Sequence, residues 1–223
     1  MTLDYEVIHA NRKTIGITVE RDRKVVVRVP QQVSEQAVKA AVESKLFWIW
    51  QKLRDPRKYP DPKPHKEFVT GETFLFLGQH YALILTNGEG GEVRLVGKQF
   101  EMARSDRRNG DALFRSWYLA QAKEKLRPRI ASFATEIGVA YSRIWVRDLK
   151  YSWGSCTPGG TLSFNWRIIQ APMIVVDYLI VHELAHVLVP NHSQDFWNIV
   201  AVHVPSWKKA RSWLEEHGGR LEW

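Results

Sequence analysis

The sequence predicts an α+β protein whose N-terminal half is rich in β-strands and whose C-terminal half carries the longer helices. Two patterns support this class. Short β-branched runs bounded by charged or glycine-containing turns recur before residue 105, and extended apolar patterns with helical spacing follow after residue 106. At 223 residues and 44% hydrophobic content, the chain can bury a sizeable core. We therefore expect a β-rich region at residues 1–105 and a second region at residues 106–223.

The N-terminal region is expected to consist of strands around a single helix. Ser34 is a typical N-cap for a helix at residues 35–54, and the prolines of residues 54–64 predict a linker or an extended crossing segment. Strands are predicted at residues 5–9, 14–19, 24–30, 73–77, 81–85, 93–96 and 99–102.

The C-terminal region is expected to alternate helices with short strands. An amphipathic pattern predicts a helix at residues 111–137, which Pro128 would kink or split. Strands are expected at residues 142–147, 149–153 and 161–165, with a turn at residues 154–160 joining the last two. Helices are also predicted at residues 172–188, 194–204 and 207–217, with Ser193 and Ser206 as N-caps of the last two.

The segment His182-Glu-Leu-Ala-His186 carries the clearest chemical signal. On a helix, His182 and His186 lie one turn apart on the same face, a spacing that suits two nitrogen ligands of one zinc ion. Glu183 lies beside that face, where its carboxylate can act as general base on a water activated by the metal. Pro190 breaks the helix, so the chain can fold back and bring in His192 as third ligand. Three protein ligands with a fourth position open are typical of catalytic zinc.

The alternative is an inert helix whose histidines are solvated or hydrogen-bonded. The preceding residues 173–181 are strongly apolar, so we expect this helix to be buried nearly all round. Two histidines and a glutamate on a buried helix need partners, because burying unpaired polar groups is costly. The context therefore favours the metal site.

The chain resembles a known family over most of its length. The resemblance is carried by Arg147, residues 153–156 (Trp-Gly-Ser-Cys), Gly160, Asn165, residues 177–178, residues 182–186, residues 191–193 (Asn-His-Ser), residues 196–197, Pro205 and Trp207, and by residues 12–16, 25–30 and 71–81. Together these residues are similar to the YgjP-like family of zincin-fold metallopeptidases, which is related in plan to the SprT-like proteases. Their combination is specific, whereas no single piece is.

The resemblance implies a zincin-like metallopeptidase core whose active-site helix lies under a small sheet. In that core His182, His186 and His192 would bind zinc, and Glu183 would be the base for hydrolysis of a peptide or protein substrate. The spacing of His186 and His192 equals that of the metzincins. Those enzymes carry Gly where this chain has Val189, however, and no Met-turn is visible.

Four more residues are candidates for supporting roles, each with a structural alternative. Tyr178, four residues before His182, would donate to an oxyanion or pack as a core tyrosine. Asn165 would polarise the substrate or fix a strand end. Cys156 would serve as nucleophile or metal ligand, although packing is favoured. Asp177 would orient a zinc histidine or complement the helix dipole.

Two other functions stay open from the sequence. The same metal centre can hydrolyse a phosphoanhydride, such as that of a nucleoside triphosphate, although no Walker-type loop is present. The likeness to SprT-like proteins suggests a protease that acts near nucleic acid. A non-catalytic zinc protein is disfavoured, because a structural site has no need of Glu183. A single cysteine, no signal-peptide pattern and no membrane-length apolar run favour a soluble cytoplasmic protein without a membrane partner.

Basic residues are in excess, with 32 Lys and Arg against 24 Asp and Glu and a net charge of +8. Such an excess can attract nucleic acid or nucleotides, but no base-reading motif accompanies it. We therefore predict that any nucleic-acid binding is weak and dominated by phosphate contacts. Affinity for a labelled single strand or duplex should fall steeply with salt and vary little with sequence. Tight, sequence-selective binding at near-physiological salt would contradict this prediction.

Overall fold

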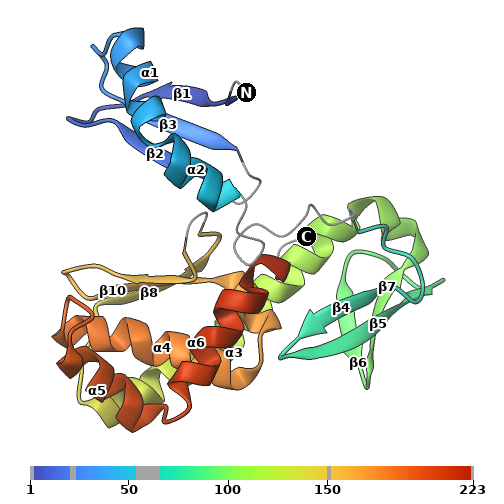
Figure 1. Cartoon of the computed structure of the whole chain (residues 1–223). Helices are drawn as coiled ribbons and strands as arrows, with labels where there is room; N and C mark the ends of the chain where they lie inside the picture. The colour runs from blue at the N-terminus through green and yellow to red at the C-terminus, as the bar shows by residue number, and fades with distance from the viewer. Residues whose placement is uncertain (1–2, 21–23, 54–65, 150–151, 222–223) are drawn as a thin grey trace. The chain divides into compact units, whose positions relative to one another are not determined.

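The computed structural model describes residues 3–20, 24–53, 66–149 and 152–221. These residues form a mixed α+β structure with six α-helices and three small sheets (Figure 1). The chain divides into two compact units, one of Met1–Lys63 with Gly218–Arg220 and one of Pro64–His217 with Leu221–Trp223. The boundary expected between residues 105 and 106 falls inside the second unit, since strands before it share a hydrophobic core with helices after it. As a division between a β-rich and a catalytic region, it stays a prediction.

The first unit is a three-stranded sheet with two helices. Strands β1 (Glu6–His9), β2 (Gly16–Val19) and β3 (Val25–Val29) confirm the three predicted ones and lie in the order β1-β3-β2. The central strand β3 is parallel to β1 and antiparallel to β2. Helix α1 (Glu35–Ser44) begins at the predicted N-cap, because the Ser34 hydroxyl accepts a hydrogen bond from the Ala37 amide at 3.3 Å.

The single helix predicted for residues 35–54 is in fact two helices. At Lys45 the backbone leaves the helical region, with φ −112° and ψ 5°, and α2 (Leu46–Leu53) follows. The break lets the second helix bury Ile49 in the same cluster as Val38 and Val42. The proline-rich residues 54–64 lie outside the described residues.

The second unit begins with a four-stranded sheet and a long helix. The predicted strands are confirmed as β4 (Thr73–Phe76), β5 (Gln79–Thr86), β6 (Val93–Val96) and β7 (Gln99–Ala103), in the order β4-β5-β7-β6. Helix α3 (Gly110–Ile137) then runs for 28 residues, and Pro128 does not split it. This residue lies on the exposed face, where water can satisfy the carbonyl that a proline leaves unpaired.

The third sheet differs from the prediction at one strand. It consists of β8 (Arg143–Arg147), β9 (Gly154–Cys156) and β10 (Thr161–Asn165), in the order β8-β10-β9. The strand predicted for residues 149–153 is not seen at its described residues 149, 152 and 153, and the strand that pairs with β10 starts at residue 154, inside the expected turn. The turn itself is shorter, since the Gly160 amide donates to the Thr157 carbonyl at 2.9 Å. Residues 150 and 151 lie outside the described residues.

Three helices complete the second unit. They are α4 (Met173–Leu188), α5 (Gln194–His203) and α6 (Trp207–His217), close to the predicted spans. Most of α4 is buried, and it packs against α3, α5, α6 and β9 (Figure 1). Among the described residues, no helix has the combined length and apolarity that crossing a membrane requires.

Candidate active site

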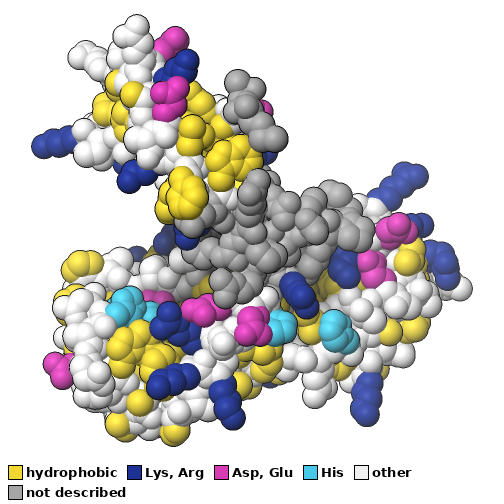
Figure 2. All heavy atoms as spheres, in the orientation of Figure 1, with side chains coloured by type: hydrophobic (Ala, Val, Ile, Leu, Met, Phe, Trp, Pro, Cys, Tyr) yellow, Lys and Arg dark blue, Asp and Glu magenta, His cyan; other side chains and the backbone are white. Residues whose placement is uncertain are grey.

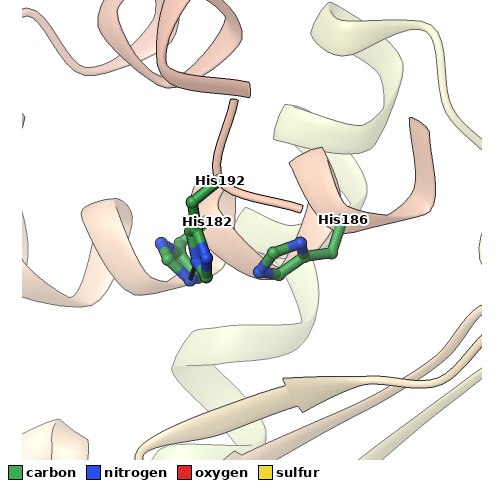
Figure 3. A group of neighbouring side chains, drawn as sticks. All are labelled: His182, His186 and His192. Carbon is green, nitrogen blue, oxygen red and sulfur yellow. Dashed lines mark hydrogen bonds between the residues drawn. The ribbon is translucent and has the colours of Figure 1, made fainter. Parts of the chain in front are cut away.

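Three histidines converge at the C-terminal end of α4 (Figure 3). His182 and His186 stand one turn apart on α4, and one ring nitrogen from each, together with one from His192, lies within 4.8 Å of the others. His192 reaches them because α4 ends at Leu188, and the extended backbone of the C-cap residue Val189 (φ −129°, ψ 105°) begins the reversal expected at Pro190. The structure thus brings all three predicted ligand candidates together.

The ring nitrogens of this cluster suit a metal ion. His186 Nδ1 lies 3.1 Å from the Val189 carbonyl, and a proton donated along that bond leaves Nε2 as the unprotonated nitrogen. His182 Nε2 and His192 Nε2 face each other at 3.2 Å. Two such nitrogens can hydrogen-bond only if one carries a proton, whereas a cation would accept the lone pairs of both. The donor set therefore fits a metal that prefers imidazole.

Burial keeps the two histidines of α4 in the form that binds metal. Burial first, then the neighbouring His186 and His192, and finally the charge of Arg211 lower the pKa of His182 to about 3. Burial also lowers the pKa of His186. Both imidazoles are therefore neutral at neutral pH, so protons compete little with a cation for their nitrogens.

Aromatic side chains of α5 hold the imidazole rings in place. The Phe196 ring centroid lies 4.9 Å from that of His182, 4.5 Å from that of His186 and 4.7 Å from that of His192. His182 Nδ1 is buried without a hydrogen-bond partner among the described residues, so packing fixes its ring. From the sequence, Phe196 was recognised only as part of the family pattern. Its position in the first turn of α5, which follows His192 closely in the chain, is the signal that indicates this contact.

Glu183 is buried beside the cluster under strand β9. Only 4% of the residue is exposed, and burial raises its pKa to about 8. A Cβ atom added to Gly154 would lie 2.8 Å from Cγ and Cδ of Glu183, so only glycine leaves room for this side chain. Sequence reasoning missed this contact, although Gly154 lies in the Trp-Gly-Ser-Cys motif. The raised pKa suits a group that accepts and releases a proton near neutral pH.

Tyr178 and Asn165, the two candidates for contact with the substrate, lie in different surroundings. Tyr178 is buried with its ring 5.7 Å from that of His182, and burial raises its pKa to about 12, so the phenol keeps its proton. Asn165 Nδ2 donates to the Leu149 carbonyl at 2.9 Å, and Oδ1 accepts from the Arg167 amide at 3.1 Å. These bonds favour the structural alternative for Asn165, which fixes the end of β10.

Cys156 and Asp177 are not part of the cluster. Burial, followed by the charge of Glu183, raises the pKa of the Cys156 thiol, which favours packing over a nucleophilic or metal-binding role. Arg129 of α3 donates to both carboxylate oxygens of Asp177, with both contacts at 2.5 Å. The role considered for Asp177 as partner of a zinc histidine is therefore wrong, because this carboxylate ties α4 to α3.

We predict that Gly154→Ala destabilises the protein by about 1–3 kcal/mol and lowers its activity, because the added methyl must displace the Glu183 side chain. Gly159→Ala is the matched control, since the atom nearest its added Cβ is Thr157 Oγ1 at 4.0 Å. This control also carries the usual effect of alanine on the unfolded chain. Chemical denaturation of both variants measures the difference. Equal free energies of unfolding would show that Gly154 is not constrained by Glu183.

Comparison with solved structures finds two metallopeptidase zymogens that are similar to part of the chain. Abylysin of Pyrococcus abyssi, solved as a metallopeptidase zymogen, is 22% identical, with 39% of this chain and 89% of that chain covered and a TM-score of 0.37. The metallopeptidase zymogen jannalysin of Methanocaldococcus jannaschii is 18% identical, with 40% and 91% covered and a TM-score of 0.36. No curated protein matches.

The family comparison covers nearly the whole chain. The model described as YgjP-like, metallopeptidase domain, matches residues 13–217. This span includes the histidine cluster, Glu183 and Gly154. The resemblance seen in the sequence is thereby confirmed, and the chain belongs to the YgjP-like family of metallopeptidase-like hydrolases.

Proposed function

We propose that this domain hydrolyses peptide bonds with one zinc ion held by His182, His186 and His192. The strongest support is the convergence of three ring nitrogens within 4.8 Å at the end of a buried helix. No Cys, Asp or Glu among the described residues joins the group. Three nitrogen donors without a fourth protein ligand are typical of catalytic zinc, whereas structural zinc has four.

Zinc bound at this site would supply a Lewis acid that polarises the scissile carbonyl and makes a water molecule easier to deprotonate. Glu183 accepts the proton of that water and passes it to the leaving amine, while the water oxygen joins the carbonyl carbon and the C–N bond breaks. Burial under β9 fixes the Glu183 side chain on the helix that carries His182 and His186. Tyr178, protonated and in contact with His182, is the residue we assign as hydrogen-bond donor to the oxyanion.

Hydrolysis of a nucleoside triphosphate and proteolysis near nucleic acid stay predictions from the sequence. To decide between peptide-bond and phosphoanhydride hydrolysis, zinc-loaded protein is assayed on a peptide library and on nucleoside triphosphates. Chelator-treated protein serves as the blank. We expect cleavage of peptides that depends on the metal. Cleavage of nucleotides without cleavage of peptides would overturn the proposal in favour of the phosphoanhydride alternative.

The ligand assignment predicts that His192→Ala loses zinc at limiting metal, because only the two histidines of α4 are left to bind it. His203→Ala is the control, since His203 is a half-buried histidine of α5 outside the cluster. Metal analysis after dialysis compares both with the unchanged protein. Full zinc content in His192→Ala would mean that the third ligand lies elsewhere, with Glu215 or Glu216 as the residues to examine next.

The general-base assignment predicts that Glu183→Gln keeps the fold and the zinc but loses about 10²–10⁴-fold in turnover, because an amide cannot accept the proton of water. Glu136→Gln, at an exposed position of α3, is the matched control. Turnover, zinc content and the circular dichroism spectrum are measured for both variants. Near-normal turnover in a zinc-loaded Glu183→Gln protein would remove Glu183 from the mechanism.

A further inference from the structure

A shelf of aromatic and basic side chains adjoins the histidine cluster. Trp197 of α5 and Trp207 of α6 stack with their ring centroids 4.3 Å apart and an angle of 17° between the rings. Arg211 lies over Trp197 at 5.5 Å, and Lys208 lies over Trp207 at 5.7 Å. We call these four residues the tryptophan shelf. On the face seen in Figure 2, hydrophobic, basic and histidine side chains of the second unit adjoin one another.

The inner end of the shelf touches the proposed metal ligands. The Trp197 ring is stacked on that of His192, with centroids 5.7 Å apart and an angle of 27°, and lies 6.1 Å from that of His182. Trp197 therefore contacts both Arg211 and the histidine cluster.

Arg211 is available to a ligand. Its side chain is 48% exposed, and its partner Glu215, which is 58% exposed, accepts a hydrogen bond from Nε at 2.9 Å. An ion pair between two such exposed side chains is weak and is screened by salt. The terminal nitrogens of the guanidinium make no hydrogen bond to a described residue. The Glu215 contact also shows that a carboxylate fits on this arginine while its guanidinium lies on Trp197.

We propose that Arg211, seated on Trp197, is a specificity-determining residue that binds a carboxylate of the peptide substrate. This inference rests on the proposed function, because the anions that a peptide offers at neutral pH are the carboxylates of Asp, Glu and the C-terminus. The planar guanidinium can bind such a group through two parallel hydrogen bonds. The tryptophan face restricts its motion and places the bound carboxylate beside the cluster.

Binding can be measured without turnover, using the zinc-loaded full chain with Glu183→Gln. Three short peptides of otherwise identical sequence are titrated calorimetrically: one with Glu and an amidated C-terminus, one with Gln and an amidated C-terminus, and one with Gln and a free C-terminus. We expect a carboxylate-bearing peptide to bind about tenfold more tightly than the neutral one at low salt. Tighter binding of the Glu peptide would show that Arg211 recognises an acidic side chain, and tighter binding of the peptide with a free C-terminus would show that it recognises the C-terminal carboxylate.

Variants of α6 identify the residue responsible. Arg211→Gln should reduce the ratio of affinities for the carboxylate-bearing and neutral peptides to within about twofold. Arg211→Lys should keep part of this preference, because lysine retains the charge but cannot make two parallel hydrogen bonds as a guanidinium does. Lys209→Gln removes the same charge from an exposed position of α6 outside the shelf and should leave the preference unchanged. Equal binding of all three peptides, no peptide binding at all, or a preference that survives Arg211→Gln would overturn the inference. Metal-dependent peptide cleavage by the protein with Glu183 intact decides the proposed function separately.

Discussion

The second unit depends on one constraint, which is that α4 is buried among α3, α5, α6 and β9 and yet carries ionisable side chains. A buried ionisable group must pair with an opposite charge, or its pKa shifts in the direction that favours the neutral form. Asp177 finds one in Arg129, whereas burial raises the pKa of Glu183 to about 8 and lowers that of His182 to about 3. The ion pair anchors the helix, the imidazoles stay neutral for metal binding, and the raised pKa of Glu183 lets it accept and release a proton near neutral pH.

The elements around α4 each complete one part of the site. Strand β9 presents Gly154 to the Glu183 carboxylate, and α5 presents Phe196 to the imidazoles. The reversal after Val189 returns His192 to the helix it has just left, and α6 adds Arg211 at the edge. Because these contacts come from whole packed elements, a change in packing at β9 or α5 alters the chemistry without touching a ligand.

How much the sequence could predict depends on how local each feature is. The histidine spacing, the break after α4 and the family were predictable, because they lie in short continuous motifs. Strand β9 was misplaced, because its position follows from pairing with β10 and from contact with Glu183, neither of which is local. The Asp177–Arg129 pair joins residues 48 positions apart, and no local pattern announces it. The split at Lys45 likewise follows from burial of Ile49 in the tertiary core.

One zinc ion held by three imidazoles, without sulfur, is the arrangement on which the proposed chemistry depends. X-ray absorption at the zinc edge of the zinc-loaded full chain tests it most directly. We expect nitrogen and oxygen neighbours at about 2.0–2.1 Å, with the outer scattering pattern of three imidazole rings. A sulfur neighbour at about 2.3 Å would instead indicate Cys156 as a ligand, and that result, or scattering from fewer than three rings, would contradict the histidine site.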